Sequence, residues 1–128
     1  MSLLLDTHAL IWWFLDAPLL SVPARAAISA ANEPIHVSAV SAFEISTKVR
    51  IGKLPPAAAL DDAFEDFLAA QRFTHLAISV RHAREAGALP IPHRDPFDRL
   101  LIAQALVEGL TLVSNEALFD GFGVQRLW

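Results

Sequence analysis

The chain has 128 residues, of which 54% are hydrophobic, and it carries a formal net charge of −4 and no cysteine. The lack of cysteine excludes disulfides and thiolate metal sites, and the net charge excludes a general basic field for nucleic acid. This length predicts one domain, residues 1–128. No segment has the roughly 20 apolar residues of a membrane span, and no basic segment precedes the apolar run 9–15, as it would in a signal peptide. We therefore expect a cytoplasmic protein without membrane contact, whose surplus apolar surface faces a partner.

Short apolar runs alternate along the chain with segments of helical character. The predicted strands are 2–5, 35–37, 73–78, 110–113 and 124–127. The predicted helices run from 7 through at least 14 and over 24–31, 39–51, 60–71, 80–88 and 96–108, with a short turn of helix ending at 119. This alternation indicates an α/β fold with a parallel sheet of about five short strands flanked by helices. Ligands of such sheets bind outside the carboxyl ends of the strands.

The first acid at this edge is Asp6, which directly follows the first predicted strand. Its carboxylate is placed either to bind a ligand or to cap the helix that begins at Thr7. His8 is a further possible ligand, although a single histidine beside a core helix is more often packed or exposed. After the fourth strand, Ser114, Asn115 and Glu116 occupy the corresponding position.

A second acid, Glu44, lies early in the helix that follows the second strand. Ser38 is suited to cap this helix, and apolar residues flank Glu44 on the helix surface. Lys48 lies four residues later, so a surface ion pair is the alternative to a functional role. Lys48, Arg50 and Lys53 form a small basic cluster near the end of this helix.

The segment 93–101 predicts a helix start that carries two carboxylates. Asp95 suits the N-cap, Pro96 the first helical position and Asp98 the third position of an acidic capping box. The face of Asp98 continues into an apolar stripe, where an acid is costly unless something positive binds it. The alternative is that both acids only cap the helix and favour its dipole. Four separate acidic positions nevertheless converge on one edge of the predicted sheet.

Three segments strongly resemble PIN-domain proteins, and in particular the VapC-type toxins of bacterial type II toxin–antitoxin pairs. They are Leu4-Leu5-Asp6-Thr7-His8-Ala9, Ser38-Ala39-Val40-Ser41-Ala42-Phe43-Glu44-Ile45 and His93-Arg94-Asp95-Pro96-Phe97-Asp98-Arg99-Leu100-Leu101-Ile102-Ala103-Gln104-Ala105. The third motif is highly specific, and the resemblance covers essentially the whole chain. It implies a PIN-like, three-layer α/β/α fold in which the first and fourth strands are neighbours.

The resemblance also implies the site. Its catalytic acids fall on Asp6, Glu44, Asp98 and Glu116, and Asp95 is the additional acid of this subfamily. The implied metal ligands are Asp6, Asp95, Asp98 and Glu116. The family most often has Asp or Asn where this chain has Glu116, so Asn115 is an alternative ligand, and Ser114 and Asn115 are auxiliary residues.

Clustered carboxylates without cysteine suit hard cations such as Mg²⁺ or Mn²⁺, held as one ion or as two. The resemblance implies a metal-dependent endoribonuclease that cleaves RNA and is silenced by an antitoxin, and we also expect a homodimer. The candidate phosphate contacts are Arg94, Arg99, Lys48 and Lys53. One alternative is a catalytically weak PIN-fold module that binds RNA or protein. Another, a receiver-like domain that accepts a phosphoryl group, needs a late lysine, and no lysine follows Lys53.

Overall fold

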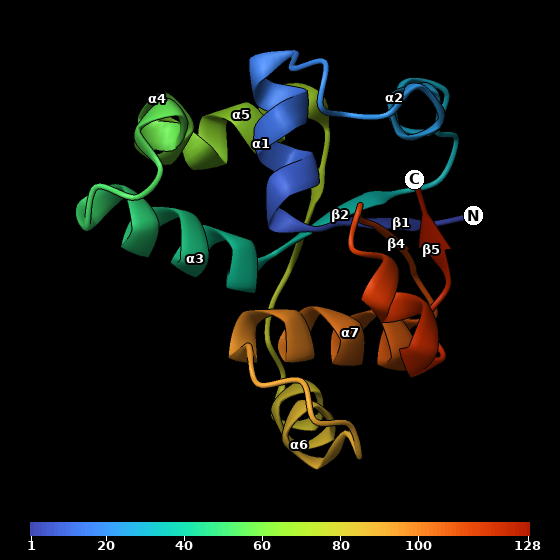
Figure 1. Cartoon of the computed structure of the whole chain (residues 1–128). Helices are drawn as coiled ribbons and strands as arrows, with labels where there is room; N and C mark the ends of the chain where they lie inside the picture. Colours follow the sequence, from blue (N-terminus) through green and yellow to red (C-terminus); the bar gives the residue numbers. More distant parts are fainter.

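The structure is a computed structural model that describes residues 1–128, and its centre is a five-stranded sheet (Figure 1). Every strand pair is parallel, in the order β3-β2-β1-β4-β5. The strands are β1 (Leu3–Leu5), β2 (Ile35–Ser38), β3 (Thr74–Leu76), β4 (Thr111–Val113) and β5 (Arg126–Leu127). The predicted parallel α/β fold is therefore confirmed, including the implied pairing of the first and fourth strands.

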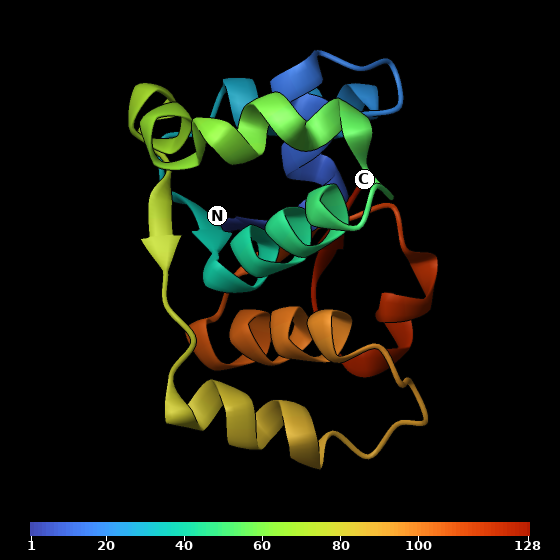
Figure 2. The same cartoon turned by 90° about the vertical axis from the view of Figure 1, so that its left-hand side faces the viewer.

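Helices cover both faces of the sheet, which gives three layers (Figures 1 and 2). One layer contains α1 (Thr7–Leu15), α2 (Val22–Ser29), α4 (Ala58–Asp62) and α5 (Phe64–Gln71), and the opposite layer contains α6 (Val80–Ala88) and α7 (Pro96–Glu108). The helix α3 (Ala39–Arg50) extends outward from the end of β2, and two short 3-10 helices are η1 (Pro55–Ala57) and η2 (Ala117–Phe122). No helix combines the length and the apolar character needed to cross a membrane.

The alternation of side chains along β1 explains the two layers. Leu3 and Leu5 are buried in the cluster that α1, α2 and α5 cover, whereas Leu4 is buried in the cluster formed with α7. Successive strand residues point to opposite faces of a sheet, so three consecutive leucines join two separate cores. The run Leu3–Leu5 thus reads as continuous apolar sequence because both faces are covered.

The centre of the sheet is the point at which the strand order reverses. Leu5 of β1 pairs with Val37 on one side and with Val113 on the other. The backbone N–H of Asp6 donates to the Val113 carbonyl oxygen at 3.0 Å. Residues that follow β1 and β4 are therefore neighbours at the carboxyl edge, where open α/β sheets bind their ligands.

Two predicted helices differ in the structure. The expected helix 60–71 is divided into α4 and α5, since Ala63 leaves helical geometry with φ −119° and ψ 28°. The expected helix 24–31 begins earlier, at Val22, because the Ser21 hydroxyl accepts the Ala24 N–H, and Pro23 is tolerated in a first turn. Neither change moves a residue of the acidic edge.

Candidate functional site

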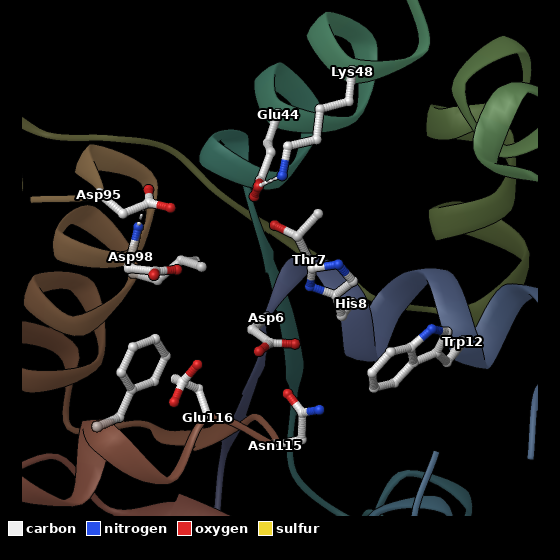
Figure 3. Close-up of a pocket in the computed structure, with 12 residues that line it drawn as sticks. Asp6, Thr7, His8, Trp12, Glu44, Lys48, Asp95, Asp98, Asn115 and Glu116 are labelled. Atoms are coloured by element: carbon white, nitrogen blue, oxygen red, sulfur yellow. Dashed lines mark hydrogen bonds and ion pairs between the residues drawn. The ribbon is translucent and has the colours of Figure 1, made fainter. Parts of the chain in front are cut away.

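The carboxyl edge of the sheet contains a pocket of about 310 Å³ (Figure 3). All five acids that the sequence singles out lie in its lining: Asp6, Glu44, Asp95, Asp98 and Glu116. The remaining lining residues are Thr7, His8, Trp12, Lys48, Leu101, Asn115 and Phe119. The structure therefore brings together side chains that are separated by up to 110 positions in the sequence.

Asp6 is a buried acid at the centre of the pocket, with 7% of its surface exposed, and it also caps α1. One of its oxygens, Oδ1, accepts the Ala9 N–H at 2.8 Å, as the capping alternative predicts. Burial raises the pKa of Asp6 from 3.8 to about 6, and hydrogen bonds from Ser114 and Ala9 offset only part of this effect. Capping uses only one of the two carboxylate oxygens. Because burial makes the ionised form of Asp6 unfavourable, a cation in the pocket would stabilise that form.

The start of α7 contributes two acids with different environments. Asp95 is the N-cap and its Oδ1 accepts the N–H groups of Phe97 and Asp98 at 2.9 and 3.3 Å. Asp98 does not complete the expected capping box, because its Oδ2 is bonded to His93 Nε2 at 2.9 Å. Burial raises the pKa of Asp98, the His93 hydrogen bond lowers it, and the charges of Asp95 and Glu44 raise it.

A buried polar contact fixes α7 against the sheet. Gln104 is fully buried, and its Oε1 accepts the Ser38 hydroxyl at 2.5 Å while its Nε2 donates to the Ala77 carbonyl at 3.3 Å. Ser38 in turn caps α3 by accepting the Val40 N–H. The helices that carry Asp98 and Glu44 are thus connected through the end of β2.

Glu44 is buried at 6% exposure, and its Oε2 accepts from Lys48 Nζ at 2.5 Å (Figure 3). This is the ion pair expected from the spacing, but it lies in the pocket lining and not on an open surface. Lys48 is the only Lys or Arg in that lining. It therefore balances part of the negative charge that five neighbouring acids create.

The segment after β4 presents both alternative ligands. Ser114 is buried, and its hydroxyl accepts the Glu116 N–H at 3.1 Å. The Glu116 Oε1 accepts the Leu118 N–H at 3.3 Å, at the start of η2. Asn115 and Glu116 both line the pocket, so each presents its side chain on the side where Asp6 lies.

Arg99 has a structural environment that its sequence position did not reveal. Its guanidinium donates to the backbone carbonyls of Ala86, Gly87, Leu89, Ile91 and His93 at 2.7–3.3 Å. All five N–H groups of the side chain are used, and none remains for a phosphate. The expected role of Arg99 as a phosphate contact is therefore replaced by a structural one. Of the other basic candidates, Arg94 and Lys53 are exposed and lie outside the pocket lining.

Replacing Arg99 by Lys should lower the free energy of unfolding by at least about 2 kcal/mol, because an ammonium has three donors and cannot span five carbonyls. Urea unfolding gives this number, and hydrogen exchange should show faster opening of residues 86–93. The matched control is Arg94→Lys, an exposed neighbour that should change stability by less than about 0.5 kcal/mol. Equal effects of the two variants would contradict the structural role of Arg99.

The donor set of the pocket suits a hard divalent cation, since it offers carboxylate and amide oxygens and no sulfur. No three Asp, Glu or His side chains lie close enough together to form a ready metal group. Two of the acids are instead engaged by His93 and Lys48. A bound ion would compete with both of these contacts, and its charge would relieve the repulsion among the acids.

Sequence reasoning missed two features of the site. The first is His93, which contacts Asp98 and lies against Phe119 and Phe122, with ring-centroid distances of 6.1 and 5.8 Å. The second is Trp12, which is not among the predicted site residues but lines the pocket. For Trp12 a signal existed, because it lies four residues after His8 and six after Asp6.

Comparisons with known proteins agree with this architecture. A family model described as PIN domain matches residues 3–123. The chain is 32% identical over 116 residues to Ribonuclease VapC22 of Mycobacterium tuberculosis. The matched segment covers 90% of this chain and 87% of that relative.

Two solved structures illustrate the likeness of fold. One is VapBC2 from Rickettsia felis bound to a promoter DNA fragment, with a TM-score of 0.71 at 20% identity and full coverage of both chains. Another is a toxin–antitoxin complex from Klebsiella pneumoniae, with a TM-score of 0.66 at 21% identity, covering 94% of this chain and 92% of that one. Together with the family match over residues 3–123 and the shared sequence of the ribonuclease relative, they place this chain in the PIN-domain family, as a VapC-type member.

Proposed function

We propose that this protein is a metal-dependent endoribonuclease that acts as the toxin of a toxin–antitoxin pair. The observation that carries the proposal is the pocket in which five carboxylates surround the carboxyl edge of the sheet. The relative named as a ribonuclease supports cleavage of RNA, and the fold of toxin–antitoxin complexes supports the paired arrangement. We further propose that the protein works in the cytoplasm, where its RNA substrate occurs.

We assign the metal ligands to Asp6, Asp95, Asp98 and Glu116, with Asn115 as the alternative to Glu116. A Mg²⁺ or Mn²⁺ ion bound there supplies Lewis acidity and lowers the pKa of a coordinated water molecule. Burial raises the pKa of both Asp6 and Asp98, and a bound cation would favour the ionised form of each carboxylate.

The second group of residues handles the substrate and the proton. Lys48 holds Oε2 of Glu44, which leaves Oε1 of Glu44 to accept a proton from the attacking water. The Lys48 ammonium also lies where it can contact a phosphate of the RNA strand. Arg94 and Lys53 extend these phosphate contacts outside the pocket.

We propose two protein partners, a cognate antitoxin and a second copy of this chain. Exposed apolar side chains support both: Leu19, Val22, Phe43, Val80 and Leu118 are each at least 64% exposed. Two aromatic residues of α1 have partners within the chain: Trp13 donates to Gln71 at 2.9 Å and Phe14 packs edge-on against Phe67. These two side chains therefore serve packing within the chain.

A single-turnover assay on a labelled RNA tests the proposal. We expect cleavage in Mn²⁺ or Mg²⁺ and none in EDTA, with recovery when the metal is restored. Induction in cells should stop growth, and co-expression of the protein from the adjacent reading frame should restore it. RNA that is retained but not cut under every metal condition would instead support the alternative, a PIN-fold binding module without useful catalysis.

A further inference from the structure

The aromatic rings of His8 and Trp12 line one side of the pocket, and the ring of Trp128, which is outside the lining, packs against Trp12. His8 and Trp12 are four residues apart on α1 and therefore share a helix face. Their ring centroids are 5.4 Å apart. The ring of Trp128, just after β5, has its centroid 5.7 Å from that of Trp12. Figure 3 shows His8 and Trp12 on the opposite side of the pocket from Asp95 and Asp98. We call these three residues the aromatic wall.

The environment of Trp12 differs from that of the next residue. Trp13 uses its indole N–H on Gln71 of α5, whereas Trp12 faces the pocket. The Trp12 N–H makes no hydrogen bond in the chain, and it is open to solvent because no buried polar side-chain atom lacks a partner. His8 is exposed, and Trp12 and Trp128 are partly exposed. The aromatic wall thus offers accessible ring surface and a free donor beside the acids.

The charges of the site provide little electrostatic attraction for the phosphates of RNA. Five acids and one paired lysine line the pocket, and the whole chain has a net charge of −4. Phosphate contacts normally supply most of the affinity for a nucleic acid, and here few cations are placed to make them. Stacking of a base on an aromatic ring does not depend on charge, and it typically changes affinity by roughly 5- to 150-fold per base.

We propose that the aromatic wall is a nucleobase subsite, in which Trp12 stacks on a base of single-stranded RNA next to the phosphate that the acids address. The inference rests on the proposed function for the identity of the ligand. Trp128 and His8 both pack against the indole of Trp12 and hold it in place. The subsite is tolerant of base identity, because every base has a flat face.

The test is a thermodynamic cycle in which a residue of the protein and the bases of the RNA are removed separately and together. Binding of a mixed-sequence 12-nucleotide RNA is measured on the uncut strand in the Asp98→Asn background, and compared with an oligomer of the same charge that lacks bases. Trp12→Leu should weaken binding of the normal RNA by roughly 5- to 150-fold and leave the abasic oligomer unchanged. Trp13→Leu is the matched control and should change neither affinity. Tryptophan fluorescence of the protein with Trp12 intact should fall on addition of normal RNA only.

Equal losses for normal and abasic RNA would show that Trp12 serves packing or binds a protein side chain, and would overturn the subsite. If Trp12→Leu does not fold, His8→Ala on the exposed residue and the fluorescence of the protein with Trp12 intact still decide, since both must depend on the presence of bases. A base-dependent effect in a chain that never cuts RNA would support the subsite and contradict the nuclease. Metal-dependent cleavage without any base dependence would support the nuclease and contradict the subsite.

Discussion

Asp98→Asn should reduce RNA cleavage by at least about 100-fold, which corresponds to about 2.7 kcal/mol of transition-state stabilisation. The substitution keeps the shape of the side chain and removes a charge that lies half-buried at the start of α7. Asp95 remains as the N-cap of the helix, so the helix itself should be unaffected. Asp6→Asn should have a comparable effect on cleavage, since it removes the central charge of the same pocket.

The matched control for this experiment is Asp62→Asn, which makes the same change in net charge at an exposed position of α4 outside the pocket lining. Its cleavage rate should remain within about twofold of the unchanged chain. The measurement is the single-turnover rate at saturating protein in Mn²⁺, with circular dichroism to verify folding. Wild-type rates for both Asp6→Asn and Asp98→Asn would mean that these acids serve only as helix caps and dipole partners.

Asp6→Asn should at the same time stabilise the metal-free protein at neutral pH. The folded-state pKa of Asp6 is raised from 3.8 to about 6 by burial. Well below its ordinary pKa of 3.8 the carboxyl is protonated in both the folded and the unfolded chain, and the folded state has its full stability. Between pH 4 and 6 only the unfolded chain loses the proton, so stability falls as pH rises, by about 3 kcal/mol in total.

Asparagine cannot ionise and still accepts the Ala9 N–H as an N-cap. In EDTA at pH 7 the variant should therefore be more stable by up to about 3 kcal/mol, on the order of 10 °C in Tm, and no more stable at pH 4. Thermal unfolding at pH 4, 5, 6 and 7 measures this difference, with Asp62→Asn again as the control. A gain of the same size at pH 4 and pH 7 would contradict the buried charge as its cause.

In the unchanged chain, a bound metal ion should offset the loss of stability that ionisation of Asp6 causes as the pH rises. A divalent cation binds the ionised carboxylates, so Mn²⁺ should stabilise the protein little near pH 4 and more near pH 7. At a free concentration 100 times Kd, the gain is about 2.7 kcal/mol. Asp6→Asn should lose most of this gain, which separates the two effects of the same side chain.

The parts of the site that the sequence predicts are those with a local cause. Asp6 and Asp95 follow from capping preferences beside a strand end and a Pro-initiated helix, and both are observed as caps. The edge that collects the acids follows from the parallel order of short strands, which is a rule of topology. A cap can be predicted from one residue type at the start of a helix, and the edge from the order of strands and helices along the chain.

The remaining contacts depend on where an irregular segment runs. Arg99 bonds to five carbonyls between Ala86 and His93, and no periodicity encodes the path of that segment. The contact of His93 with Asp98 has the same origin, since His93 lies outside the helix. The different roles of Trp12 and Trp13 also depend on tertiary contacts. Trp12 packs against Trp128 and Trp13 donates to Gln71, and both partners are distant in the sequence.

The central place of β1 in the sheet affects how the protein is made. A ribosome releases Asp6 and Glu44 early, but the strand that completes the other side of β1 begins only at Thr111. Segments at the amino end fold first during synthesis, so a nascent chain that ends just before Thr111 has four of the five pocket acids, lacks Glu116 and leaves one edge of β1 open. The pocket is complete only after Asn115 and Glu116 have been added, so we expect no RNA cleavage by the nascent chain before that point. Chains cut short by a premature stop before Asp95 should likewise be harmless to the cell.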